Sequence, residues 1–124
     1  MLRLRQLCLV ANDLNQIERD LKSIFQLEVC HRDPGVEKFG LHNFLMPIDT
    51  NFLEVVAPFE ENTSAGRYLK QKGGDSGYMI IMQCDDVKNV RKTRDFQNKR
   101  VCVSYPSLRW RAHTSFFLDK PQFF

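Results

Sequence analysis

The sequence predicts an α+β fold built from two successive β-α-β-β-β units, of which the second lacks its last strand. Between residues 4 and 26, an apolar segment, an acidic helix cap and an amphipathic helix follow one another. Alternating apolar and polar residues then indicate strands up to residue 58. The order of apolar segment, acidic pair and helix start returns from residue 78, which makes a weak internal repeat.

The first unit opens with a strand that leads directly into a helix. Residues 4–11 (LRQLCLVA) are short and apolar, and Asn12 and Asp13 follow as a helix cap. Gln16 stands three residues after Asp13, the spacing of a capping box. Apolar residues then recur at helical spacing, at Leu14, Ile17, Leu21, Ile24 and Phe25. We expect this helix to end near Gln26.

Three strands are predicted to complete the first unit. Residues 27–33 (LEVCHRD) alternate, and Asp33-Pro34-Gly35 is a turn signal, beside which we expect His31 to be exposed. Residues 39–48 (FGLHNFLMPI) and 51–58 (NFLEVVAP) give two further strands.

A polar connector and an incomplete second unit follow. Residues 59–76 include Ser64 as the predicted cap of a short helix that stops at Gly73-Gly74. YMIIMQC, a helix start at Val87, RVCVSYP and LRWRAHTSFFL make up the second unit. We therefore expect one domain over residues 1–124, with module one at about 1–58, the connector at 59–76 and module two at 77–124.

Composition argues against several functions. The net charge is only +3, and the densest basic stretch, residues 88–100, has no alternating aromatics, so we expect a solvated helix face and no nucleic-acid partner. Neither a nucleophile elbow nor a glycine-rich phosphate loop occurs. Four scattered cysteines without a C-x-x-C pair suit reduced thiols, and no signal peptide or membrane span is seen. These features predict a cytoplasmic protein that does not bind membranes.

Two stretches resemble a known superfamily. FGLHNFLMPIDTNFLEVVAP and SLRWRAHTSFF are similar to the Gly-x-His-Asn, Tyr-Leu-Glu and Trp-Arg strands of glyoxalase-like proteins, with Phe52 where Tyr is frequent. These proteins belong to the vicinal oxygen chelate superfamily, which includes glyoxalases, bleomycin resistance proteins, epimerases and dioxygenases. The resemblance implies a curled mixed-sheet cup, a small-molecule pocket, pairing into homodimers and a divalent metal ion.

The same resemblance implies a metal site that is incomplete in this chain. Metal-binding members place ligands at the positions of Gln6, Glu54 and Met79 and on the final strand. Here only Gln6 and Glu54 fit, because the Met79 thioether is a poor ligand for hard or borderline ions. The fourth ligand would lie beyond Phe124. A partner subunit that donates ligands is the alternative.

Glu54 is the strongest candidate site residue. A carboxylate in the apolar run FLEVVA is costly to bury unless it is paired, protonated or bound to a cation. Without metal it would serve as a general base with a raised pKa. The alternative is that Glu54 points to solvent on an amphipathic strand.

Other candidates each have a structural alternative. Gln6 and Phe52 share the pocket face with Glu54 by strand alternation, although Gln6 also suits a half-exposed edge. His42 and Asn43 are neighbours on a strand, so only one faces the pocket, and His42 is the candidate catalytic residue or a structural histidine. His113 corresponds to it in module two. Trp110 and Arg111 would bind an anionic or aromatic substrate, unless Trp110 anchors the core.

Three hypotheses for function follow. The first is a glyoxalase-like enzyme of lyase or isomerase type, or a degenerate relative, that abstracts a proton from a small carbonyl-containing or aromatic metabolite. The second is a metal-free protein of the same fold that sequesters a small molecule. The third is a regulatory or structural domain that dimerises through its unfinished sheet.

Overall fold

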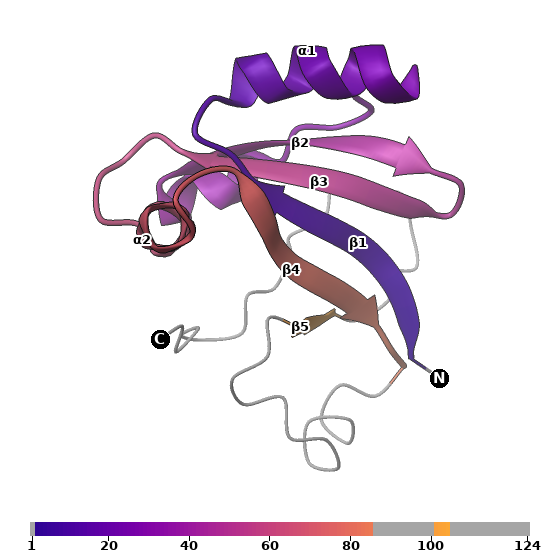
Figure 1. The fold of residues 1–124 in the computed structure, drawn as a ribbon. Coiled ribbons are helices and arrows are strands. Elements are labelled where there is room, and N and C mark those ends of the chain that lie inside the picture. The colour runs from indigo at the N-terminus through magenta and orange to yellow at the C-terminus, as the bar shows by residue number, and fades with distance from the viewer. Residues whose placement is uncertain (1, 86–100, 105–124) are drawn as a thin grey trace.

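The computed structural model describes residues 2–85 and 101–104, the latter as backbone only. Figure 1 shows a sheet with one helix, α1, across one of its faces. The elements in chain order are β1 (Arg3–Val10), α1 (Leu14–Phe25), the 3-10 helix η1 (Pro34–Phe39), β2 (Leu41–Ile48), β3 (Asn51–Pro58), α2 (Ser64–Lys72), β4 (Ser76–Gln83) and β5 (Val101–Ser104). The predicted α+β class is confirmed.

The sheet is mixed, and its centre is the first strand of the chain. Its strand order is β2-β3-β1-β4-β5. β1 runs parallel to β3 and antiparallel to β4. Figure 1 shows β1 and β4 curving away together from the flatter pair β2 and β3. The first strand thus joins the first unit of the chain to the second.

Helix α1 has the boundaries that its capping residues dictate. The Asp13 side chain accepts hydrogen bonds from the backbone N–H groups of Asn15 and Gln16, which the first helical turn leaves unpaired. Gln16 does not complete a capping box, because its side chain bonds Asp20 and Arg19 instead. The helix ends at Gln26, whose left-handed backbone (φ 54°) lets its N–H reach the Lys22 carbonyl.

The prediction of a strand at residues 27–33 is wrong, because only one isolated bridge, between His31 and Leu45, forms there. Cys30 N–H donates to the Leu45 carbonyl, while Leu45 N–H donates to the His31 carbonyl. Two residues thus stand opposite one, which interrupts the ladder. Pro34, which has no N–H to donate, then begins η1 with Asp33 as its cap. The turn signal at Asp33-Pro34-Gly35 therefore starts a helix.

The connector contains the expected helix, shifted by one residue at its start. Thr63, not Ser64, caps α2, because the Thr63 hydroxyl accepts from Gly66 N–H at 2.9 Å. The helix ends at Gly73 (φ 77°), where a left-handed backbone favours glycine. The part of the chain that the structure describes has no helix long and apolar enough to cross a membrane.

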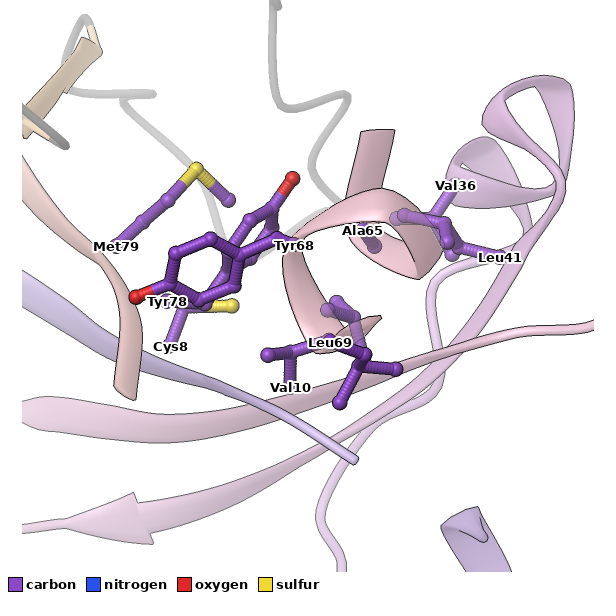
Figure 2. Packing of buried hydrophobic residues seen from close by; sticks show 10 residues of the cluster. Cys8, Val10, Val36, Leu41, Ala65, Tyr68, Leu69, Tyr78 and Met79 are labelled. Atoms are coloured by element: carbon purple, nitrogen blue, oxygen red, sulfur yellow. The ribbon is translucent and has the colours of Figure 1, made fainter. Parts of the chain in front are cut away.

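Two apolar clusters lie on opposite faces of the sheet. On the α1 face, Phe44, Met46, Leu53 and Val55 pack with Leu21 of the helix. On the other face, α2 and η1 pack against β1, β3 and β4. Figure 2 shows Leu69 and Ala65 of α2 in the middle of this second cluster, with Tyr68, Tyr78, Cys8 and Met79 at one end and Val36 and Leu41 at the other.

Two strands of the second unit are described. β4 begins at Ser76, and β5 pairs with it in parallel, from Ile80↔Val101 to Gln83↔Ser104. β3 stands in the same parallel relation to β1, so β5 occupies the position beside β4 that the closing strand has in the first unit. The helix predicted from Val87 and the strand LRWRAHTSFFL lie outside the described residues.

Candidate functional site

The site centres on one carboxylate in the middle of the sheet. Glu54 lies on β3, between Leu45 of β2 and Cys8 of β1. Its exposed fraction is 5%, which is unusual for a charged residue type. The sheet face that it shares with Gln6, Cys8, Asn43 and Phe52, opposite α1, is called the Glu54 face below.

Two side-chain amides hold this carboxylate. Asn43 Nδ2 donates to Glu54 Oε1 and Gln6 Nε2 donates to Glu54 Oε2, each at 2.7 Å. Asn43 is itself fixed, because its Oδ1 accepts from the Asp33 backbone N–H at 2.8 Å. Each carboxylate oxygen is therefore bonded, which offsets part of the cost of burying the group.

Burial raises the pKa of the Glu54 carboxyl above its ordinary value, and the nearby Asp33 charge raises it further. Hydrogen bonds from Asn43, Cys8 and Gln6 act in the opposite direction without cancelling the effect of burial. The donors around Glu54 in the described residues are neutral amides and a thiol, so no cation among these residues lowers its pKa. A carboxyl in this state can take up and release a proton nearer to neutral pH.

The described donors do not fit a complete metal site. Among residues 2–85, no group of three His, Cys, Asp or Glu side chains is placed to hold an ion. Gln6 and Glu54 do come together, but as a hydrogen-bonded pair. Met79, one strand beyond Cys8, adds only a buried thioether. These residues hold and orient a carboxyl without forming a coordination sphere.

His42 and Asn43 point to opposite sides of β2, and the structure puts Asn43 beside Glu54. The exposed His42 ring stacks on Phe59, with centroids 4.3 Å apart, and its Nδ1 lies 4.0 Å from Glu37 Oε1. The structure therefore does not bring the expected catalytic His42 to the carboxylate. Of the two neighbours, Asn43 is the one that faces Glu54.

Phe52 stands directly beside Gln6 on the Glu54 face, half-buried, and the Arg5 guanidinium carbon lies 4.8 Å above its ring centroid. The structure thus gathers Gln6, Phe52 and Glu54 on one face, as strand alternation predicts. The other predicted substrate-binding residues, Trp110, Arg111 and His113, lie outside the described residues.

The structure adds His31 to the surroundings of the site. It is half-buried, although exposure was expected, and its Nε2 is buried without a hydrogen-bond partner in the described part of the chain. His31 pairs with Leu45, and Leu45 pairs with Glu54, so the three stand in one row across the sheet. The sequence does not indicate that His31 lies near Glu54, because the strand predicted at residues 27–33 forms only one bridge.

No protein-family model and no curated protein matches the sequence. Solved structures do match. Streptomyces coelicolor methylmalonyl-CoA epimerase, in complex with 2-nitronate-propionyl-CoA, superposes with a TM-score of 0.67 at 20% identity, over 77% of this chain and 69% of that one. This chain has the epimerase fold. Mycobacterium tuberculosis methylmalonyl-CoA epimerase gives 0.65 at 13% identity, over 73% and 63% of the two chains.

A hypothetical protein of Bacillus halodurans also shares the fold, with a TM-score of 0.67 at 10% identity over 74% of this chain and 66% of that one. Another similar structure is a methylmalonyl-CoA epimerase in complex with methylmalonyl-CoA and an ammonium ion. Methylmalonyl-CoA epimerases belong to the vicinal oxygen chelate superfamily. At these identities the likeness establishes the fold that the sequence motifs predict, whereas the chemistry depends on the side chains of the site itself.

Proposed function

We propose that this protein is a member of the vicinal oxygen chelate superfamily that moves a proton next to the carbonyl group of a small metabolite, with Glu54 as the base. The observation that carries the proposal is the Glu54 carboxyl itself, buried at 5% exposure and held at both oxygens by amides. A side chain kept at this cost in the centre of a sheet is more typical of a reactive group than of a packing residue.

The reaction needs no group beyond those on the Glu54 face. Ionised Glu54 takes the proton from the carbon beside the carbonyl, and the C–H electron pair forms the carbon–carbon double bond of an enolate. Negative charge passes to the carbonyl oxygen, which accepts a hydrogen bond from the second N–H of Gln6. Glu54 then returns the proton: delivery to a neighbouring carbon on the same side gives an isomer, and delivery to the original carbon after the enolate has turned over gives an epimer.

The raised pKa suits this role because a stronger base removes a carbon-bound proton more readily. An exposed glutamate is a weak base at neutral pH, whereas burial brings the carboxyl closer to the working pH. The two amides fix its orientation toward the substrate, as positioning residues do. The epimerases of the same fold carry out an isomerase-type reaction, which supports this class of chemistry.

Binding without turnover is the second candidate function. The observation in its favour is that both Glu54 oxygens are already paired by amides. The resemblance to the superfamily also implies that Met79 replaces a metal ligand. In that form the Glu54 face would hold a small molecule and release it unchanged.

We also propose that the chain is one domain, acts as a homodimer and works in the cytoplasm, as its sequence and the family resemblance predict.

Proton exchange in deuterated water separates the two candidates. A panel of small 2-oxo acids and acyl thioesters is incubated with protein, and loss of the proton signal beside the carbonyl is followed by NMR. We expect exchange with at least one compound, and a loss of about a hundredfold or more in Glu54→Gln. Glu60→Gln, at an exposed glutamate, is the matched control and should exchange at the unaltered rate.

Two results would contradict the enzyme proposal. One is equal exchange by Glu54→Gln and the unaltered protein, provided that both melt cooperatively. The other is the absence of exchange across the panel while a compound of the panel raises the melting temperature, which would favour binding without turnover.

A further inference from the structure

We propose that Arg5 is an anion-binding residue of this site, so that the substrate is a small carbonyl compound carrying a carboxylate or phosphate group. The anionic group of the substrate would bind the Arg5 guanidinium beside Phe52. The carbon that loses its proton would then lie next to the Glu54 carboxyl. This inference rests on the proposed function, because it names the substrate class of the same face of the sheet.

A bulge in β1 sets the position of Arg5. Opposite β4, Leu4 pairs with Met82 and Gln6 pairs with Ile81, so Arg5 is an extra residue without a partner. Strict alternation would send Arg5 to the face opposite Gln6, but a bulge turns side chains away from their regular direction. The Arg5 guanidinium accordingly lies over the ring of Phe52, which is the parallel partner of Gln6 on the Glu54 face.

The charge of Arg5 has no acidic partner among the described residues. Arg3 lies 3.9 Å from Asp85, and Arg32 bonds Glu18 at 2.5 Å, whereas Arg5 makes no ion pair within residues 2–85 and its guanidinium lies over the Phe52 ring. An aromatic ring restrains the guanidinium through its face and leaves the N–H groups at its edge available. Those N–H groups match the two oxygens of a carboxylate or phosphate. Within the described part of the chain, Arg5 is therefore a positioned cation that lacks an anion.

The spacing to Glu54 fits a small molecule. Phe52 and Glu54 are two residues apart on β3, which is about 7 Å along a strand. In a ligand whose anionic group binds Arg5, a carbon a few bonds from that group would thus lie at the Glu54 carboxyl. The positive charge of Arg5 also offsets the repulsion that an anionic substrate would meet from ionised Glu54.

Calorimetric titration with matched probes tests this inference. The probes are 2-oxobutanoate, its uncharged methyl ester and inorganic phosphate, titrated into the unaltered protein, Arg5→Gln, Arg5→Lys and the control Arg3→Gln. We expect 2-oxobutanoate to bind at least tenfold more tightly than its ester, and phosphate to compete with it. Arg5→Gln should lose this preference and bind 2-oxobutanoate about tenfold or more weakly, whereas Arg3→Gln should keep the preference. Arg5→Lys should retain part of it, because lysine keeps the charge without the paired N–H groups.

Three outcomes would overturn the inference: equal binding of acid and ester, no binding of either anion by the unaltered protein, or an unchanged preference in a folded Arg5→Gln protein. Proton exchange on the same probes distinguishes this failure from failure of the proposed function. Arg5-dependent binding of 2-oxobutanoate without Glu54-dependent exchange supports the anion site and contradicts the enzyme. Exchange that is equally fast on acid and ester supports the enzyme and contradicts the anion site.

Discussion

Asn43 Nδ2 lies 2.7 Å from Glu54 Oε1, and this hydrogen bond joins two buried polar side chains across the β2–β3 pair. The Asn43 amide also accepts from the Asp33 N–H, so one side chain fixes both the carboxyl and the start of η1. The orientation of the reactive group and the path of the chain before β2 are thereby coupled.

Replacing this amide with a hydrocarbon of similar size should destabilise the fold. In Asn43→Leu, Glu54 Oε1 and the Asp33 N–H both lose their partner while still buried from water. We expect a loss of about 1–3 kcal/mol in the free energy of unfolding, measured by urea denaturation. Asn51→Leu, at the half-exposed start of β3, should change it by less than about 0.5 kcal/mol. An equal effect of the two substitutions would contradict the role given to Asn43.

The raised pKa of Glu54 makes stability fall as pH rises. Because the folded protein holds this proton more tightly than the unfolded chain does, stability is lost as pH increases from the ordinary glutamate pKa through the folded pKa. Glu54→Gln removes the titration, so its stability relative to the unaltered protein should increase between acid and neutral pH. Urea unfolding of both proteins across this range measures the difference, and a difference independent of pH would contradict the raised pKa.

Glu18 should show the reverse dependence. Burial acts to raise the pKa of this carboxyl, but hydrogen bonds from Arg32 and Lys22 outweigh burial and lower it. Its contribution to stability is therefore present above the unfolded pKa and is lost as pH falls through the folded pKa. In Glu18→Gln, we expect the stability deficit relative to the unaltered protein to be largest at neutral pH. Urea unfolding checks this, and a deficit that grows toward acid pH would show that the sign is wrong.

Gly40, between η1 and β2, should tolerate no side chain. Its φ is 70°, and an added Cβ would lie 2.8 Å from both Glu60 Cβ and Thr63 Cγ2. We expect Gly40→Ala to cost about 1–3 kcal/mol of unfolding free energy, read from thermal or urea denaturation. The control is Gly77→Ala, where no atom lies within 4 Å of an added Cβ. A neutral Gly40→Ala would mean that the loop before β2 adapts freely.

Chelation should leave the folded protein unchanged, because Gln6 and Glu54 are bonded to each other and Met79 is a soft neighbour. We expect the same melting temperature with and without EDTA. Elemental analysis of protein purified without chelator is the second measurement. About one equivalent of a divalent ion per chain, together with a lower melting temperature in EDTA, would instead mean that ligands arrive from elsewhere in the assembly.

Local patterns predicted the elements whose limits are local. The Asp13 cap and the apolar spacing mark α1 correctly, and the alternation in NFLEVVAP matches β3 residue for residue. The pattern at residues 27–33 failed because only the bulge against Leu45 and the proline that follows decide whether a strand forms there. The sequence predicted an element correctly where residues close in sequence determine it. The prediction failed where pairing with a distant strand determines the element.

The same distinction applies to the site. Gln6 and Glu54 were placed together because the family resemblance and alternation in their own strands agree. The choice between His42 and Asn43 depends on the register in which β2 pairs with β3, with Leu45 opposite Glu54, and a single sequence does not give that register. The position of Arg5 depends on a bulge that is visible only once β4 lies beside β1.

The central place of β1 in the sheet has a consequence for how the protein is made. β1 precedes both of its neighbours, β3 and β4, in the chain, and Gln6 meets Glu54 across 48 positions of sequence. Long loops must therefore close before the carboxyl has its partners, which makes folding slow relative to helical domains of this size. Until those loops close, β1 has unpaired N–H and C=O groups on both of its edges, and such an edge is prone to pair with another chain.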